Sequence, residues 1–157
     1  MSTDQLLMFL ARWLHILSAT LAVGVPIYIW WVLNPALKTL DEPARSNLRE
    51  SLARRWRFIV YLIILIFLVT GFYNFLVVKR WADFPSDLKF RYRLYFGIKL
   101  LAALGIFFLL SAIAGRSAKL EPIRRKSGFW LLVVILLGVL VIVISGTMRF
   151  MGPTASA

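Results

Sequence analysis

The chain has 157 residues, of which 61% are apolar and 17% are charged, and its mean hydropathy is +0.80. Soluble domains contain about 45–50% apolar and about 25% charged residues, so this composition excludes an ordinary soluble protein and indicates an integral membrane protein. The absence of cysteine excludes disulfide bonds and thiolate metal sites. The net charge of +12 comes largely from basic residues that flank apolar stretches, so we expect membrane lipids, and no nucleic acid, as partners.

Four apolar stretches follow one another along the chain, at about residues 6–33, 56–78, 94–114 and 129–147. Each reaches the roughly 20 residues that an α-helix needs to cross the hydrocarbon core of a bilayer. Open sheet edges and irregular loops are excluded at that depth, because lipid offers the backbone no hydrogen bonds. The sequence therefore predicts an all-α fold, an integral membrane four-helix bundle that forms a single transmembrane domain over residues 1–157.

Prolines and capping residues predict where the first two helices bend, end and begin. Pro26 should bend the first helix and Asn34-Pro35 should end it, because proline lacks an amide donor and restricts the residue before it. Asp41 is a candidate N-cap for the second helix. Apolar residues recur every four positions from residue 48 to residue 56, so this helix should begin outside the membrane and continue into it.

The distribution of Lys and Arg predicts the orientation of the bundle. The connections after the first and third helices together hold 11 basic residues, and the opposite side of the membrane holds six. Connections rich in Lys and Arg stay in the cytoplasm. We therefore expect a multi-pass membrane protein with both termini outside the cytoplasm.

Three ionisable residues, Arg12, His15 and Lys99, lie inside the apolar stretches, and His15 is the only histidine of the chain. A charge near mid-membrane costs roughly 2.5–3.5 kcal/mol, so such residues usually have a partner or a function. Arg12 and His15 share a helix face, and Lys99 lies on a helix that runs in the same direction. Thr70 and Asn74 share a face near the outer end of the second helix, which predicts one polar pocket in the outer half of the bundle. The alternatives are that Arg12 and Lys99 only extend to the interface and that the others serve helix packing.

The apolar stretches contain no Asp or Glu, so Arg12 and Lys99 lack a carboxylate within the membrane. An anionic ligand would supply the missing charge. A b-type heme or a related tetrapyrrole fits this requirement, because His15 can ligate the iron while Arg12 and Lys99 hold the propionates, with Asn74 as a further cofactor-binding residue. A quinone or a lipid phosphate remains an alternative ligand.

Copper is the alternative metal, because thioethers and imidazoles are the ligands that Cu(I) prefers. Met148 and Met151 lie near the outer end of the fourth helix and are candidate ligands together with His15. The other interpretation of this Met pair is ordinary apolar anchoring in the membrane.

Several short motifs resemble those of a known family. The sequence Trp13-Leu14-His15-Ile16-Leu17, the pair Thr70-Gly71 and the segment from Tyr95 to Lys99-Leu100-Leu101 resemble the CopD-like (copper resistance D) superfamily of bacterial membrane proteins. A related branch is the HemJ-type protoporphyrinogen oxidase, in which a corresponding His and Lys are associated with activity and heme b. The resemblance implies those roles for His15 and Lys99, and it implies a location in the bacterial inner (plasma) membrane. The chain departs from the family at Ala22, where a Trp is usual, and at Ile27, where the HemJ-type branch has Arg.

Three functional hypotheses follow, and they leave open whether the protein is an enzyme. The first is a protein that binds heme b at a His/Arg/Lys pocket and has a redox role. The second is copper uptake or homeostasis, and the third is a non-catalytic accessory subunit of a larger membrane complex. A single histidine per chain also suggests a homo-oligomer, because ligation of one heme by two histidines requires a second protomer.

Overall fold

The computed structural model describes residues 2–78 and 86–150, and these residues are almost entirely helical. The elements are α1 (Thr3–Tyr28), a π-helical segment (Ile29–Leu33), α2 (Asn34–Leu37), α3 (Glu42–Val78), α4 (Ser86–Ala114), a 3-10 turn (Ala118–Leu120), α5 (Glu121–Arg125) and α6 (Ser127–Phe150). Four helical segments within the described residues are long and apolar enough to cross a membrane. The predicted all-α membrane bundle of four spanning helices is confirmed.

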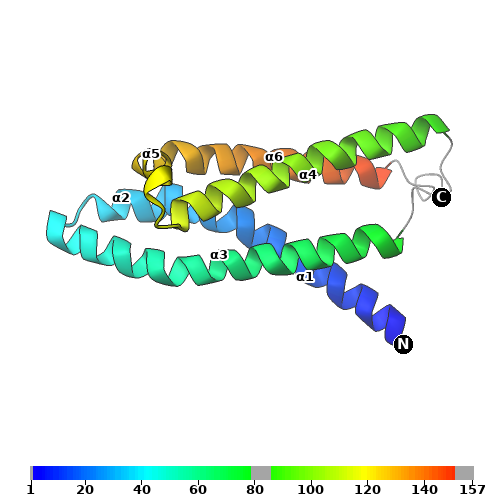
Figure 1. Cartoon of the computed structure of the whole chain (residues 1–157), viewed down its shortest axis with the longest axis horizontal. Coiled ribbons are helices and arrows are strands. Elements are labelled where there is room, and N and C mark those ends of the chain that lie inside the picture. The colour runs from blue at the N-terminus through cyan, green and yellow to red at the C-terminus, as the bar shows by residue number, and fades with distance from the viewer. Residues whose placement is uncertain (1, 79–85, 151–157) are drawn as a thin grey trace.

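The four long helices pack as two antiparallel pairs (Figure 1). α1 packs most extensively on α3 and α4 on α6, while α1 also contacts α6 and α3 contacts α4. α1 and α4 therefore lie diagonally across the bundle. The N-terminus of α1 and the C-terminus of α6 lie at one end, which we call the outer end, and α2 and α5 lie at the other, the inner end.

The first spanning helix continues past the point where proline was predicted to end it. A π-helical segment follows α1, and α2 carries the helix on to Leu37, so the predicted end at Asn34-Pro35 is wrong. In this segment the amide of Asn34 bonds to the carbonyl of Ile29, five residues back. A proline ring clashes with the carbonyl four residues before it, and the wider turn ahead of Pro35 relieves that clash without ending the helix.

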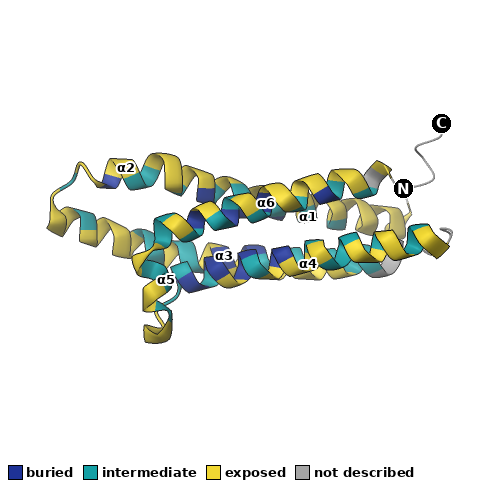
Figure 2. Ribbon diagram, turned by 90° about the horizontal axis from the view of Figure 1, so that it is seen from above, coloured by how far each residue is buried: buried dark blue, intermediate teal, exposed yellow. Residues whose placement is uncertain are grey.

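The buried core occupies the inner half of the bundle, between α3, α4 and α6 (Figure 2). It is built from Val60, Ala103, Ile106, Phe107, Leu109, Leu110, Ala114 and Val134. By contrast, α1 diverges from the other helices towards its N-terminus (Figure 1). Residues 2–10 are all exposed, so the outer turns of α1 do not pack on the rest of the described bundle.

α3 is the longest element, and it extends beyond the membrane. Its 37 residues span about 55 Å at a rise of 1.5 Å per residue, whereas the hydrocarbon core is about 30 Å thick. It begins at Glu42, directly after the predicted N-cap Asp41, whose carbonyl accepts the amide of Arg45 at 2.9 Å. The inner turns of α3 project past α5 (Figure 1).

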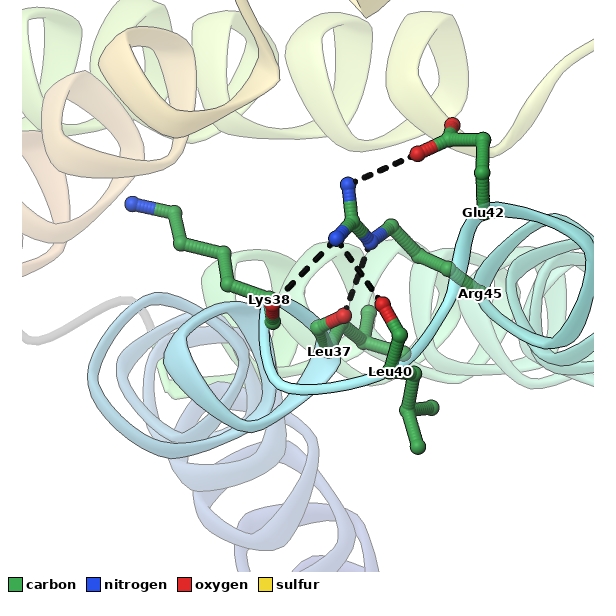
Figure 3. A network of polar contacts seen from close by, with 5 residues as sticks. All are labelled: Leu37, Lys38, Leu40, Glu42 and Arg45. Atoms are coloured by element: carbon green, nitrogen blue, oxygen red, sulfur yellow. Dashed lines mark hydrogen bonds and ion pairs between the residues drawn. The ribbon is translucent and has the colours of Figure 1, made fainter.

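The turn that leads into α3 is closed by an arginine (Figure 3). Arg45 pairs with Glu42 at 2.9 Å. Its guanidinium also donates hydrogen bonds of 2.9–3.2 Å to the carbonyls of Leu37, Lys38 and Leu40. The last carbonyls of a helix have no partner within it, so Arg45 satisfies the carbonyls of Lys38 and Leu40 and adds a second bond to that of Leu37, which also accepts the amide of Leu40 at 3.4 Å. We call this arrangement the Arg45 clasp.

The turn between α4 and α6 repeats this arrangement with the same Glu-Pro-Xaa-Arg sequence, 79 residues further along the chain. Arg124 pairs with Glu121 at 2.7 Å. It donates hydrogen bonds to the carbonyl of Ser117 at 2.8 Å and to that of Gly115 at 3.4 Å. We call this the Arg124 clasp. Each antiparallel helix pair is thus closed at its inner end by one clasp.

Candidate functional site

His15 lies on the face of α1 that contacts α3, and three residues of a single α3 segment hold it. Its Nδ1 is 3.2 Å from Oγ1 of Thr70, which is buried. Its ring lies against Phe67 with 4.1 Å between the centroids, and Phe67 in turn contacts Phe107 of α4 edge-on at 5.1 Å. The imidazole is therefore fixed on one edge by a hydrogen bond and on one face by an aromatic ring.

The hydrogen bonds of Thr70 favour one neutral tautomer of His15, with the proton on Nδ1. A threonine hydroxyl has one proton to donate, and Oγ1 of Thr70 directs it to the backbone, with the carbonyl of Ile66 at 2.6 Å and that of Phe67 at 3.3 Å. Towards His15 the hydroxyl oxygen therefore acts as an acceptor, and Nδ1–H is the donor. In the neutral imidazole this leaves the lone pair on Nε2.

Gly71 allows the imidazole to approach α3 this closely. A Cβ atom at this position would lie 3.0 Å from Cε1 and 3.4 Å from Nδ1 of His15. Any larger residue at position 71 would push the ring away from Thr70. The pair Thr70-Gly71 thus provides both the hydrogen bond and the space that His15 requires.

Lys99 lies on α4, diagonally opposite α1, and is half-buried. Near this level Phe96 of α4 stacks on Phe75 of α3 with 4.3 Å between the ring centroids. Within the described residues Lys99 makes no hydrogen bond or ion pair, so its ammonium has no anionic partner there.

Arg12 and Asn74, the other two predicted pocket residues, lie near His15 but do not hold it. Arg12 lies one turn outward from His15, is exposed, and forms no ion pair within residues 2–78 and 86–150. Asn74 lies one turn outward from Thr70 on α3 and is half-buried. Both lie near His15 along their helices, but among the described residues neither makes a hydrogen bond to it.

The predicted copper ligands lie only partly within the described residues. Met148 is half-buried on α6, and Met151 lies outside the described residues. The part of the chain that the structure describes contains no group of three His, Cys, Asp or Glu side chains arranged to hold a metal ion. The Met pair stays a prediction.

Sequence reasoning missed Phe67 at this site, whereas it pointed to Ser18 as a possible partner of His15. Phe67 is one of 12 phenylalanines, and nothing in its sequence surroundings distinguishes it from those that face lipid. Ser18 lies one turn inward from His15 and is only 4% exposed, yet its hydroxyl makes no hydrogen bond among the described residues. Its spacing of three residues from His15 was the available signal, because it places both side chains on the same side of α1.

Comparisons with known proteins leave the family of this chain open. No family model matches it, no curated protein matches it, and no solved structure matches it. The resemblance to the CopD-like superfamily therefore stays a prediction.

Proposed function

We propose that this multi-pass membrane protein binds a b-type heme or a related tetrapyrrole, with Nε2 of His15 as the axial ligand. The observation that carries this proposal is the hydrogen-bond pattern of Thr70, which leaves the lone pair of the neutral imidazole on Nε2. Histidines that ligate metals usually donate their other N–H to a protein oxygen, which fixes the tautomer and the ring orientation. Here Oγ1 of Thr70 is the protein oxygen that accepts this hydrogen bond.

The donor set also fits the charge of such a ligand. Lys99 is a half-buried cation without a carboxylate partner in the described residues. A propionate would form a charge-assisted hydrogen bond with it in a surrounding of low dielectric constant. We propose that Lys99 binds a ligand carboxylate and that Arg12, which is exposed, contributes less. A bound heme would supply one-electron redox chemistry, while the chain supplies ligation and orientation.

An absorption spectrum of the protein purified in mild detergent tests the ligation. We expect a Soret band, either directly or after addition of heme, and its loss in His15→Ala. Thr70→Val should weaken heme binding about 10–100-fold, the usual range for loss of a supporting hydrogen bond. Thr20→Val is the matched control, because Thr20 also bonds the carbonyl four residues back, at 2.9 Å, but is exposed on α1. A protein that folds but shows no Soret band after heme addition would exclude the proposal.

A porphyrin with esterified propionates tests the role of Lys99 separately. Lys99→Gln should weaken binding of heme but leave binding of its dimethyl ester nearly unchanged, because the ester has no charge for Lys99 to pair with. Arg12→Gln should affect both ligands little. Equal weakening of heme and ester in Lys99→Gln would show that Lys99 supports the fold of the site and does not bind a carboxylate.

A further inference from the structure

A hollow of about 530 Å³ opens at the inner end of the bundle, beside α5. It is lined by Ala118, Glu121, Pro122, Arg125 and Lys126. It lies at the opposite end from His15, which is in the outer half of α1, so it is independent of the proposed heme site. Its lining combines one acidic and two basic side chains.

The two basic side chains of this hollow are not neutralised. Glu121 is occupied by Arg124 of the clasp at 2.7 Å. The side chains of Arg125 and Lys126 are exposed and take part in no ion pair or hydrogen bond within the described ranges. The hollow therefore presents two adjacent positive charges that an anion can neutralise.

The hollow lies at the level of lipid headgroups. α6 begins at Ser127, directly after Lys126, and the apolar membrane span begins there as well. Phe129 and Trp130 form an aromatic pair with 5.3 Å between the ring centroids in the first turn of α6. Aromatic residues gather at the membrane–water interface, so the basic pair is located just outside the hydrocarbon core.

An exposed apolar ridge continues from the hollow along α6. Phe129, Leu132, Leu136 and Val139 are all exposed large apolar residues, and their spacing places them along one side of the helix. Acyl chains can lie along this ridge while a headgroup occupies the hollow. A free anion would use the basic pair alone and would make no use of the ridge.

We propose that the hollow beside α5 binds an anionic phospholipid, with Arg125 and Lys126 on the headgroup phosphate and the α6 ridge against the acyl chains. Arg54 and Arg116, two other basic residues of the inner end, both form ion pairs with Glu50, at 3.8 and 3.6 Å. Arg125 and Lys126 have no such carboxylate partner in the described residues. The site thus selects for a lipid by combining unpaired charge with adjacent apolar surface. Zwitterionic lipids offer the same acyl chains but no net negative charge.

Lipid titration of the full-length protein in mild detergent tests this site. Phosphatidylglycerol, phosphatidylcholine with the same acyl chains and glycerol 3-phosphate are added separately, and binding is measured by native mass spectrometry and by the shift in melting temperature. We expect binding and stabilisation with phosphatidylglycerol only. Equal effects of phosphatidylcholine would show a general lipid effect, and equal effects of glycerol 3-phosphate would show a site for a free phosphate; either result would overturn the proposal.

Two double variants locate the site. Arg125→Gln with Lys126→Gln should weaken phosphatidylglycerol binding about 30-fold, since each basic residue near a membrane surface contributes about fivefold. Arg49→Gln with Arg55→Gln is the matched control. Both residues are exposed on α3, and the two substitutions remove the same charge from the same end of the bundle. Equal losses in both variants would attribute binding to the overall positive charge and overturn the proposal. If the first double variant does not fold, Lys126→Gln alone should still weaken binding several-fold, and an unchanged affinity would also overturn it.

Discussion

At the scale of single residues, the position of His15 depends on a hydrogen-bond acceptor in one turn of α3 and equally on the absence of a side chain in the same turn. Thr70 supplies an acceptor for Nδ1–H, and Gly71 supplies space, since a Cβ there would lie 3.0 Å from Cε1 of the imidazole. Phe67 closes one face of the ring. Removing the acceptor and filling the space are therefore two separate ways to disturb the same ring.

Gly71→Ala tests the close approach without changing any hydrogen-bonding group. The added methyl group should displace the imidazole and destabilise the protein by about 1–3 kcal/mol, the usual cost of overpacking. Gly97→Ala is the control, because a Cβ at Gly97 meets nothing within 4 Å, and alanine there should be neutral or slightly stabilising. Thermal unfolding in detergent measures both. A Gly71→Ala variant as stable as the Gly97→Ala variant would contradict this geometry.

The residues of the candidate site were partly accessible from sequence. A lone histidine and a lysine in apolar stretches are conspicuous because each is costly there. The exposure of Arg12 was one of two alternatives that the sequence left open, since it depends on how far α1 diverges from the bundle. The contact with Phe67 was not predictable, because an aromatic side chain in a lipid-exposed helix and one in a packed helix look alike in sequence.

At the scale of elements, the two clasps show that a count of basic residues, which predicts orientation, does not reveal the hydrogen bonds that those residues make. Arg45 and Arg124 contribute to the positive side of the membrane in any count of basic residues, but each also satisfies carbonyls at a chain reversal. The π-helical segment is a similar case, because a proline inside an apolar stretch predicts a break unless the preceding turn widens. Both features arise from backbone geometry that residue types alone do not specify.

The clasps predict a difference between two substitutions in the same turn. Arg45→Ala removes both the ion pair and the carbonyl hydrogen bonds and should destabilise the protein by about 1–3 kcal/mol, because polar backbone groups lose their partners. Glu42→Gln removes only a partly exposed ion pair, which is worth about 0–1 kcal/mol. Thermal unfolding compares the two.

Arg49→Ala serves as the control for the clasp, because Arg49 is exposed one turn further along α3 and has no ion pair or hydrogen bond in the described structure. It should change stability by less than about 0.5 kcal/mol. The same ranking is expected of Arg124→Ala and Glu121→Gln. If Glu42→Gln were as costly as Arg45→Ala, the carbonyl hydrogen bonds would not be the stabilising contribution.

At the scale of the whole molecule, the number of spanning helices was predictable because the apolar character of each span is a property of its own residues. The pairing of α1 with α3 and of α4 with α6 follows from short connections, which join neighbours in an antiparallel bundle. The start of α3 outside its apolar stretch was predictable from the N-cap Asp41 and from the apolar repeat between residues 48 and 56, whereas the continuation of the first spanning helix to Leu37 was not. Hydropathy marks the membrane and does not mark where a helix ends.

The orientation of the bundle is tested directly by cysteine labelling, because the chain has no cysteine of its own. Thr3→Cys at the outer end should react with a membrane-impermeant maleimide in intact cells. Ser117→Cys at the inner end should react only after the membrane is permeabilised, since the inner end carries most of the basic residues. Both side chains are exposed in the structure, so the opposite labelling pattern would reverse the predicted orientation.

The paired clasps have a consequence for how the protein is made. All the contacts of the Arg45 clasp lie between residues 37 and 45, and those of the Arg124 clasp lie between residues 115 and 124. A turn that closes within ten residues needs nothing from the other half of the chain. The first helical hairpin can therefore complete its turn during synthesis, before the second has left the ribosome, and the two hairpins can enter the membrane in succession as units that have already formed.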